Sequence, residues 1–137
     1  MPIGERGISM VDVRDIGEAA AKELLRRDRA AASVPHETYE LVGPDVLTGT
    51  AISALWSDVL GRPIGYAGND LEVLEQRLKA YGPAWLAYEM RLMMHRYQQD
   101  GAIATDGELA RLTSLLGHAP RSYRAFAQSA ADTWAKF

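Results

Sequence analysis

The sequence contains no cysteine, which excludes disulfide bonds, thiolate metal sites and thiol catalysis. It also contains no apolar run near the ~18 residues that a membrane-spanning helix needs, so no membrane association is expected. Residues 1–15 include charged side chains and no continuous apolar core, and therefore do not read as a signal peptide. Together these absences predict a cytoplasmic protein.

An excess of positive charge is missing as well. The chain carries 15 Lys and Arg against 18 Asp and Glu, a net charge of −3. Nucleic-acid binders are normally basic, so no nucleic-acid partner is predicted. With 137 residues, of which 47% are hydrophobic, the chain is long enough to bury a core. We expect a single domain over residues 1–137.

The sequence has few of the motifs that carry chemistry. The three histidines, His36, His95 and His118, are scattered without metal-ligand spacing, so no metal site is predicted. The G-x-S-x-G motif of esterases is absent. No tyrosine is followed four residues later by lysine, the spacing that short-chain dehydrogenases use to lower the pKa of a catalytic tyrosine. No catalytic residue is assigned, and whether the chain is an enzyme stays open.

Three glycines, Gly61, Gly65 and Gly68, give a loose G-x-x-x-G-x-x-G. A dinucleotide-binding loop needs a strand before the glycines and a helix directly after them. Here a predicted helix precedes Gly61, and a predicted strand runs through the middle of the motif. The pattern predicts a helix end and turns, and no cofactor-binding residue is assigned.

Apolar residues recur with helical period over most of the chain. The fold class is predicted as α/β, or α+β for the isolated piece, with about six helices and two or three short strands. Helices are expected near 16–31, 48–60, 70–81, 83–99, 109–116 and 122–134, and strands from Ile8, over 38–42 and over 64–67.

Side chains that can cap helices mark several of these boundaries. Asp12 and Asp15 flank the first helix start, and Asp15 with Glu18 three residues later resembles a capping box. Thr48 can cap the second helix, and Gly61 can end it in the left-handed conformation. We therefore interpret the two aspartates as caps rather than as a catalytic carboxylate pair.

One group of residues has the character of a ligand site. Aromatic and methionine side chains line adaptable apolar pockets, and they also pack between helices, which is the more common role. Both alternatives stay open for this group. The candidate substrate-binding residues are Tyr81, Trp85, Tyr88, Met90, Met93 and Met94.

Four segments resemble the C-terminal half of NmrA-like proteins, which are atypical short-chain dehydrogenases that bind NAD(P). They are Val11–Ala21 (V-D-V-R-D-I-G-E-A-A-A), Tyr39–Pro44, Leu60–Tyr66 and Leu116–Tyr123 followed by Phe126. The resemblance runs from about Ser9 through nearly the whole chain. It implies a substrate-side domain whose Tyr81–Tyr88 stretch faces the substrate cleft.

The family's glycine-rich Rossmann half is missing from this sequence. The resemblance therefore implies that no cofactor is bound by this chain alone, and that NAD(P) is used only if a Rossmann half is supplied. Three hypotheses remain: a truncated or split oxidoreductase, a stand-alone binding or dimerisation module, and a complete enzyme, which has the least support. An apolar face left uncovered would favour a homodimer or a separately encoded Rossmann-type partner.

Overall fold

The computed structural model describes residues 1–136, which contain six helices and two short strands. This confirms the predicted α/β fold class. None of the described helices is long and apolar enough to cross a lipid bilayer. The strands are β1 (Ile8–Ser9) and β2 (Val46–Leu47), and the helices are α1 (Val13–Asp28), α2 (Gly49–Leu60), α3 (Leu71–Lys79), α4 (Ala84–Asp100), α5 (Asp106–Leu116) and α6 (Tyr123–Trp134).

The chain divides into two compact units. Unit 1 consists of Met1–Ile8 and Val46–Ile103, and unit 2 consists of Ser9–Asp45 and the chain from Ala104 on. Each unit is therefore built from two separate stretches of sequence. The expectation of a single domain stays a prediction.

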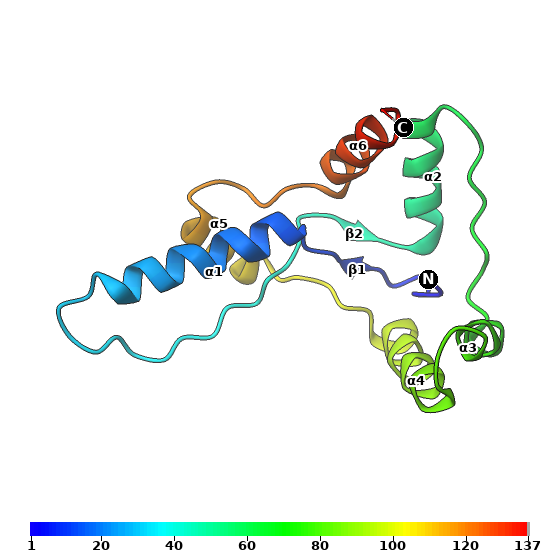
Figure 1. The fold of residues 1–137 in the computed structure, drawn as a ribbon, viewed down its shortest axis with the longest axis horizontal. Coiled ribbons are helices and arrows are strands. Elements are labelled where there is room, and N and C mark those ends of the chain that lie inside the picture. The colour runs from blue at the N-terminus through cyan, green and yellow to red at the C-terminus, as the bar shows by residue number, and fades with distance from the viewer. Residues whose placement is uncertain (137) are drawn as a thin grey trace. The chain divides into compact units, whose positions relative to one another are not determined.

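Unit 1 contains strand β2, the helices α2, α3 and α4, and Ile8 of strand β1, whereas Ser9 of β1 belongs to unit 2. Ile8 also forms a parallel bridge with Ala102. Helices α3 and α4 lie side by side (Figure 1). An ion pair joins them, because Glu75 of α3 lies 2.8 Å from Arg91 of α4. The fully buried apolar side chains of this unit are Ile3, Ala87 and Met94.

The predicted strand over 64–67 is wrong, since this segment has no regular secondary structure. Its first amide, that of Ile64, donates to the Ser57 hydroxyl of α2 at 2.9 Å instead of to a neighbouring strand. The Tyr66 ring lies against Gly49, where an added Cβ would come within 2.1 Å of a ring carbon. The segment therefore packs back onto α2, which explains its apolar residues without a strand.

Unit 2 is organised by α1 and α5, which also lie side by side (Figure 1). Their shared core contains Ala19 of α1 and Leu112 and Leu116 of α5, all nearly inaccessible to solvent. Leu41 and Val42 pack against this core from the segment that was predicted as a strand. That prediction is also wrong, because residues 38–42 have no regular secondary structure. Their alternating pattern reflects packing onto two helices.

Most predicted helix boundaries are confirmed by the capping geometry. The Thr48 hydroxyl accepts the Ala51 amide at 3.1 Å, and Gly61 ends α2 with a positive φ of 62°. The start of α5 is an exception, because this helix begins at Asp106, three residues before the predicted start. The other exception is α1. Its N-cap is Asp12, which accepts the Arg14 amide at 2.8 Å, and Asp15 lies inside the first turn. The assignment of Asp15 as a cap was therefore wrong.

Candidate functional site

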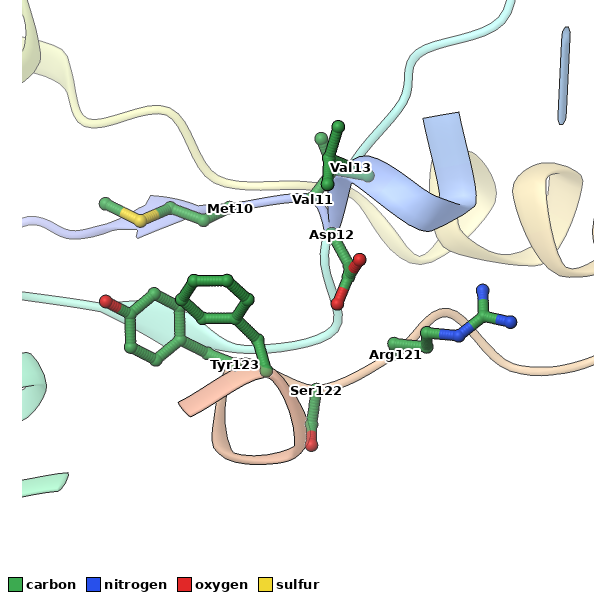
Figure 2. Close-up of a pocket in the computed structure, with 8 residues that line it drawn as sticks. Met10, Val11, Asp12, Val13, Arg121, Ser122 and Tyr123 are labelled. Atoms are coloured by element: carbon green, nitrogen blue, oxygen red, sulfur yellow. The ribbon is translucent and has the colours of Figure 1, made fainter. Parts of the chain in front are cut away.

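A pocket in unit 2 lies where the first turns of α1 and α6 meet (Figure 2). Its volume is about 240 Å³. The chain brings together two stretches more than a hundred residues apart in sequence, 10–13 and 121–126. The lining residues are Met10, Val11, Asp12, Val13, Arg121, Ser122, Tyr123 and Phe126.

The N-cap residues of α1 and α6 are among the residues that line the pocket. Asp12 caps α1, and the Ser122 hydroxyl caps α6 by accepting the Ala125 amide at 3.2 Å. The first amide of α6, that of Tyr123, donates to the Asp45 carboxylate at 2.8 Å. The caps satisfy amides that a helix start otherwise leaves without partners. The caps also determine the residue at which each helix begins, and therefore the position of the two helix starts that line the pocket.

The buried acid at the pocket edge, Asp12, is ionised. Only 7% of Asp12 is exposed, and its carboxylate pairs with Arg14 at 2.6 Å. The hydrogen bonds from the Arg14 side chain lower the pKa of Asp12, against an opposing effect of burial. The carboxylate pairs with the Arg14 side chain and caps α1, so its role is structural rather than in proton transfer.

The remaining wall is apolar and aromatic. The Tyr123 and Phe126 rings lie 5.7 Å apart, tilted by 55°. The Phe126 side chain is partly exposed. A second groove of about 350 Å³ shares Asp12, Val13 and Phe126 with the pocket and continues along α6 to Trp134. A flat apolar molecule could therefore lie against Phe126 and extend along the helix.

Arg121, which lines the pocket, forms an ion pair with a buried aspartate, Asp15, and the sequence did not reveal this pair. Asp15 is completely buried and accepts the Arg121 amide at 2.7 Å as well as a hydrogen bond from the Arg121 guanidinium. Figure 2 shows the Arg121 side chain directed away from the Tyr123 ring. Arg121 thus ties α1 to the segment before α6, and it presents little charge to a ligand.

Glu18, one turn further along α1, extends this pair into a network. It lies 3.1 Å from His118, 3.2 Å from Lys22 and 3.3 Å from Arg121. The hydrogen bond from His118, followed by that from Lys22, lowers the pKa of Glu18 to about 2. The bond of His118 to the Ala119 carbonyl, and then its bond to Glu18, raise the pKa of His118.

Metal-ligating atoms of Asp15, Glu18 and His118 lie within 4.8 Å of one another. The scattered histidines gave no sign of this grouping in the sequence. However, both carboxylates are already neutralised by Arg121 and Lys22. Since a divalent ion would have to displace these cations, the donor set fits an ion-pair network better than a metal centre.

The structure distributes the six predicted substrate-binding residues over unit 1. Met94 is buried in the core with 1% exposed, while Tyr81, Trp85 and Tyr88 are exposed by 91%, 67% and 47%. Met93 is exposed and Met90 half-buried. The substrate role of these six residues stays a prediction. None of them belongs to the 10–13 and 121–126 pocket, whose residues only the tertiary structure reveals.

The described residues do not offer the glycine-rich loop that NAD(P) phosphates require. Gly61 caps α2, and Gly65 and Gly68 lie in the segment that follows it. A helix precedes Gly61, and the segment before Gly65 and Gly68 has no regular secondary structure, so the strand–turn–helix context of a dinucleotide-binding loop is missing at these three glycines.

The chain is similar to an NAD(P)H azoreductase from Xenophilus azovorans, with 29% identity over 130 residues. The match covers 94% of this chain but 43% of that protein, so the chain spans less than half of its relative's length. No protein-family profile matches the chain. No solved structure matches it either. The similarity relates nearly the whole chain to an oxidoreductase.

Proposed function

We propose that this chain is the substrate-side part of an NmrA-like, NAD(P)-linked oxidoreductase. The observation that carries this proposal is the similarity to the azoreductase, which extends over 94% of this chain and only 43% of that protein. The V-D-V-R-D-I-G segment and the other NmrA-like motifs add support. Because the described glycines do not form a phosphate loop, the dinucleotide would be bound by a Rossmann-type part outside these residues.

In this proposal the substrate lies in the pocket between the starts of α1 and α6. Its charged side chains are already engaged, Asp12 with Arg14 and Arg121 with Asp15. What remains is an apolar wall that includes Phe126. The pocket is smaller than the ~300–1,000 Å³ typical of sites for drug-sized ligands. A neutral aromatic substrate of one or two rings fits these properties, and the azo arene implied by the relative's name belongs to that class.

A chimera tests the proposal most directly. The segment of the azoreductase that matches this chain would be replaced by this chain, and NAD(P)H-dependent bleaching of a neutral azo dye would be measured. We expect turnover, with Phe126→Ala lowering kcat/KM for the dye by about tenfold and leaving the KM for NAD(P)H unchanged, since a truncated aromatic costs roughly 1–3 kcal/mol of contact.

The matched control is Leu24→Ala, which removes another exposed apolar side chain of unit 2 that does not line the pocket. It should leave both constants unchanged. A folded chimera that binds NAD(P)H but reduces no dye would refute the proposal. Equal effects of the two variants would refute the placement of the substrate.

The isolated chain provides a second test. Titration with NAD(P)H, followed by calorimetry, should show no binding, because the proposed dinucleotide site lies in another part of the protein. Tight binding by this chain alone would contradict the assignment.

The second candidate function is a non-enzymatic dimerisation module. It is favoured by one observation, the exposed apolar side chains of α4.

A further inference from the structure

A groove between α1 and α5 of unit 2 is lined largely by cations. Its volume is about 470 Å³. Lys22 and Arg26 lie one turn apart on α1, and Arg111 lies on the neighbouring helix α5. The acid that lines the groove is Glu37. A basic groove is unexpected in a chain whose net charge is −3, and it shares no lining residue with the pocket between α1 and α6.

The contacts of the Glu37 carboxylate show that the groove can hold an anion. This carboxylate pairs with Arg26 at 3.1 Å and with Arg111 at 3.2 Å. The Tyr39 hydroxyl donates to it at 2.8 Å. The hydrogen bond from Tyr39, followed by the charge of Arg26, lowers the pKa of Glu37 against an opposing effect of burial. Side chains from α1, from α5 and from the segment between them therefore converge on one ionised carboxylate.

The two arginines keep donors that the acids of the chain do not use. A guanidinium has five N–H donors, and Arg111 directs Nη2 to Glu37. Its face stacks on the Tyr39 ring at 4.8 Å, which leaves the other N–H groups at its edge. Arg26 uses Nε and Nη2 for Glu23 and Glu37, so Nη1 stays available among the residues that the structure describes. The Ser114 hydroxyl lines the same groove.

A ligand can replace Glu37 at these donors. Glu37 lies in a segment without regular secondary structure, so its side chain can turn away without breaking a helix or a strand. The side chains of Arg26 and Arg111 are 41% and 53% exposed, and ion pairs between exposed side chains stabilise a fold by little. A phosphate monoester carries a charge of about −1.5 to −2 at neutral pH and has three strong acceptor oxygens. It therefore offers more charge and more acceptors than one carboxylate does.

An apolar pocket of about 230 Å³ adjoins the groove. The two cavities share Tyr39 and Leu115, and the pocket continues over Ile16, Ala20 and Leu41. Its volume is below the ~300–1,000 Å³ typical of sites for drug-sized ligands. One ring or a short chain fits this pocket, whereas the long chains of a lipid do not.

We propose that the groove binds the phosphate group of a small phosphate monoester, whose aromatic or apolar group lies in the adjoining pocket. Arg26, Arg111 and Ser114 donate to the phosphate, and Lys22 adds positive charge. Glu37 is an internal competitor for the same donors. The proposal does not depend on the relationship to the azoreductase, because it concerns residues outside the pocket between α1 and α6.

Isothermal titration calorimetry of the full chain with phenyl phosphate tests the proposal. We expect saturable binding that weakens as salt is added. Methyl phosphate, which lacks the ring, should bind roughly tenfold more weakly. Arg111→Gln should weaken the binding of phenyl phosphate by about tenfold or more, because it removes a charged donor. Arg29→Gln, at an exposed arginine that ends α1 outside the groove, is the matched control and should leave the affinity unchanged.

Glu37→Gln is the sharper test, because the expected change is a gain that loss of the fold cannot cause. Removing the competing charge should tighten the binding of phenyl phosphate by roughly three- to tenfold. Ala20→Leu, which fills the adjoining pocket, should weaken the binding of phenyl phosphate and leave that of methyl phosphate unchanged. Far-UV circular dichroism checks that each variant is folded.

Three results would overturn the proposal. They are the absence of saturable binding, weaker binding by Glu37→Gln than by the unchanged chain, and equal effects of Arg111→Gln and Arg29→Gln. Equal affinities of the unchanged chain for the two esters would overturn the placement of the ring in the apolar pocket.

Discussion

Replacing Asp15 by alanine is the most informative perturbation of unit 2. The Asp15 carboxylate is completely buried and accepts two hydrogen bonds from Arg121, one from the main-chain amide and one from the guanidinium. The change removes the acceptor of both. Breaking a buried ion pair by deleting one partner costs about 3–5 kcal/mol. Because a third of the Arg121 side chain is exposed and can turn to water, we expect a loss of roughly 2–4 kcal/mol.

Thermal unfolding followed by circular dichroism measures this loss. For a chain of this size, 1 kcal/mol corresponds to a shift of about 4 °C in Tm, so the Tm should fall by roughly 8–16 °C. Asp15→Asn keeps an acceptor for the Arg121 amide and should lose about half as much. Asp28→Ala, at an exposed position of α1, is the control.

The outcome distinguishes two roles of Asp15. If its carboxylate were a helix cap, as the sequence suggested, Ala would cost about 1 kcal/mol, and Arg121→Met would have no related effect. If Asp15 and Arg121 form a buried pair, the double variant should lose less than the sum of the single variants. A loss below 1 kcal/mol for Asp15→Ala, or strictly additive losses, would refute the reasoning.

Three further predictions concern stability. Because the pKa of His118 is raised above its ordinary value of 6.5, His118 stabilises the fold at low pH, and this stabilisation is lost as the pH rises through the raised pKa. The pKa of Glu18 is lowered instead, so its stabilisation of the fold is lost as the pH falls from 4.5 toward 2. His118→Gln should remove the loss on the alkaline side in urea titrations at several pH values, and an unchanged profile would contradict this. Gly43→Ala should destabilise the fold by about 1–3 kcal/mol or more, because the added Cβ would lie 1.8 Å from a main-chain carbonyl oxygen. Gly17→Ala in α1 should stabilise the fold by about 0.5–1 kcal/mol, because the added Cβ would meet no atom within 4 Å. Equal Tm values for the two variants would refute both predictions. Thr105→Ala should lower the free energy of unfolding by about 1 kcal/mol, because it removes the capping box that starts α5. Thermal unfolding measures this loss, and an unchanged Tm would argue against that cap.

Local signals in the sequence were enough to locate most helices. Helix α2 begins after Thr48, whose hydroxyl caps it, and ends at Gly61, which adopts the left-handed conformation. Asp70 caps α3 in the same way as Thr48 caps α2. These features depend on residues within a few positions of one another, so chemistry alone specifies them. The start of α5 was missed by three residues because Thr105 and its partner Glu108 precede the first leucine of the helical pattern.

Features that depend on distant partners could not be predicted in the same way. A strand requires a neighbour, and residues 38–42 and 64–67 pack against helices instead. The six residues proposed as a substrate site share apolar character, but periodicity does not tell which side of a helix a neighbour covers. In the structure Met94 is buried while Trp85 faces solvent.

The first segment of the chain shows the division most clearly. The sequence by itself determined that a helix begins beside Asp12 and Asp15, because short acidic side chains accept hydrogen bonds from helix amides. Only the tertiary structure decided their separate roles. Asp12 caps α1 and edges the pocket, and Asp15 is buried against Arg121, which is more than a hundred residues away in sequence. Local hydrogen bonding is encoded within one turn, whereas the partner of a buried charge is chosen by how the whole chain packs.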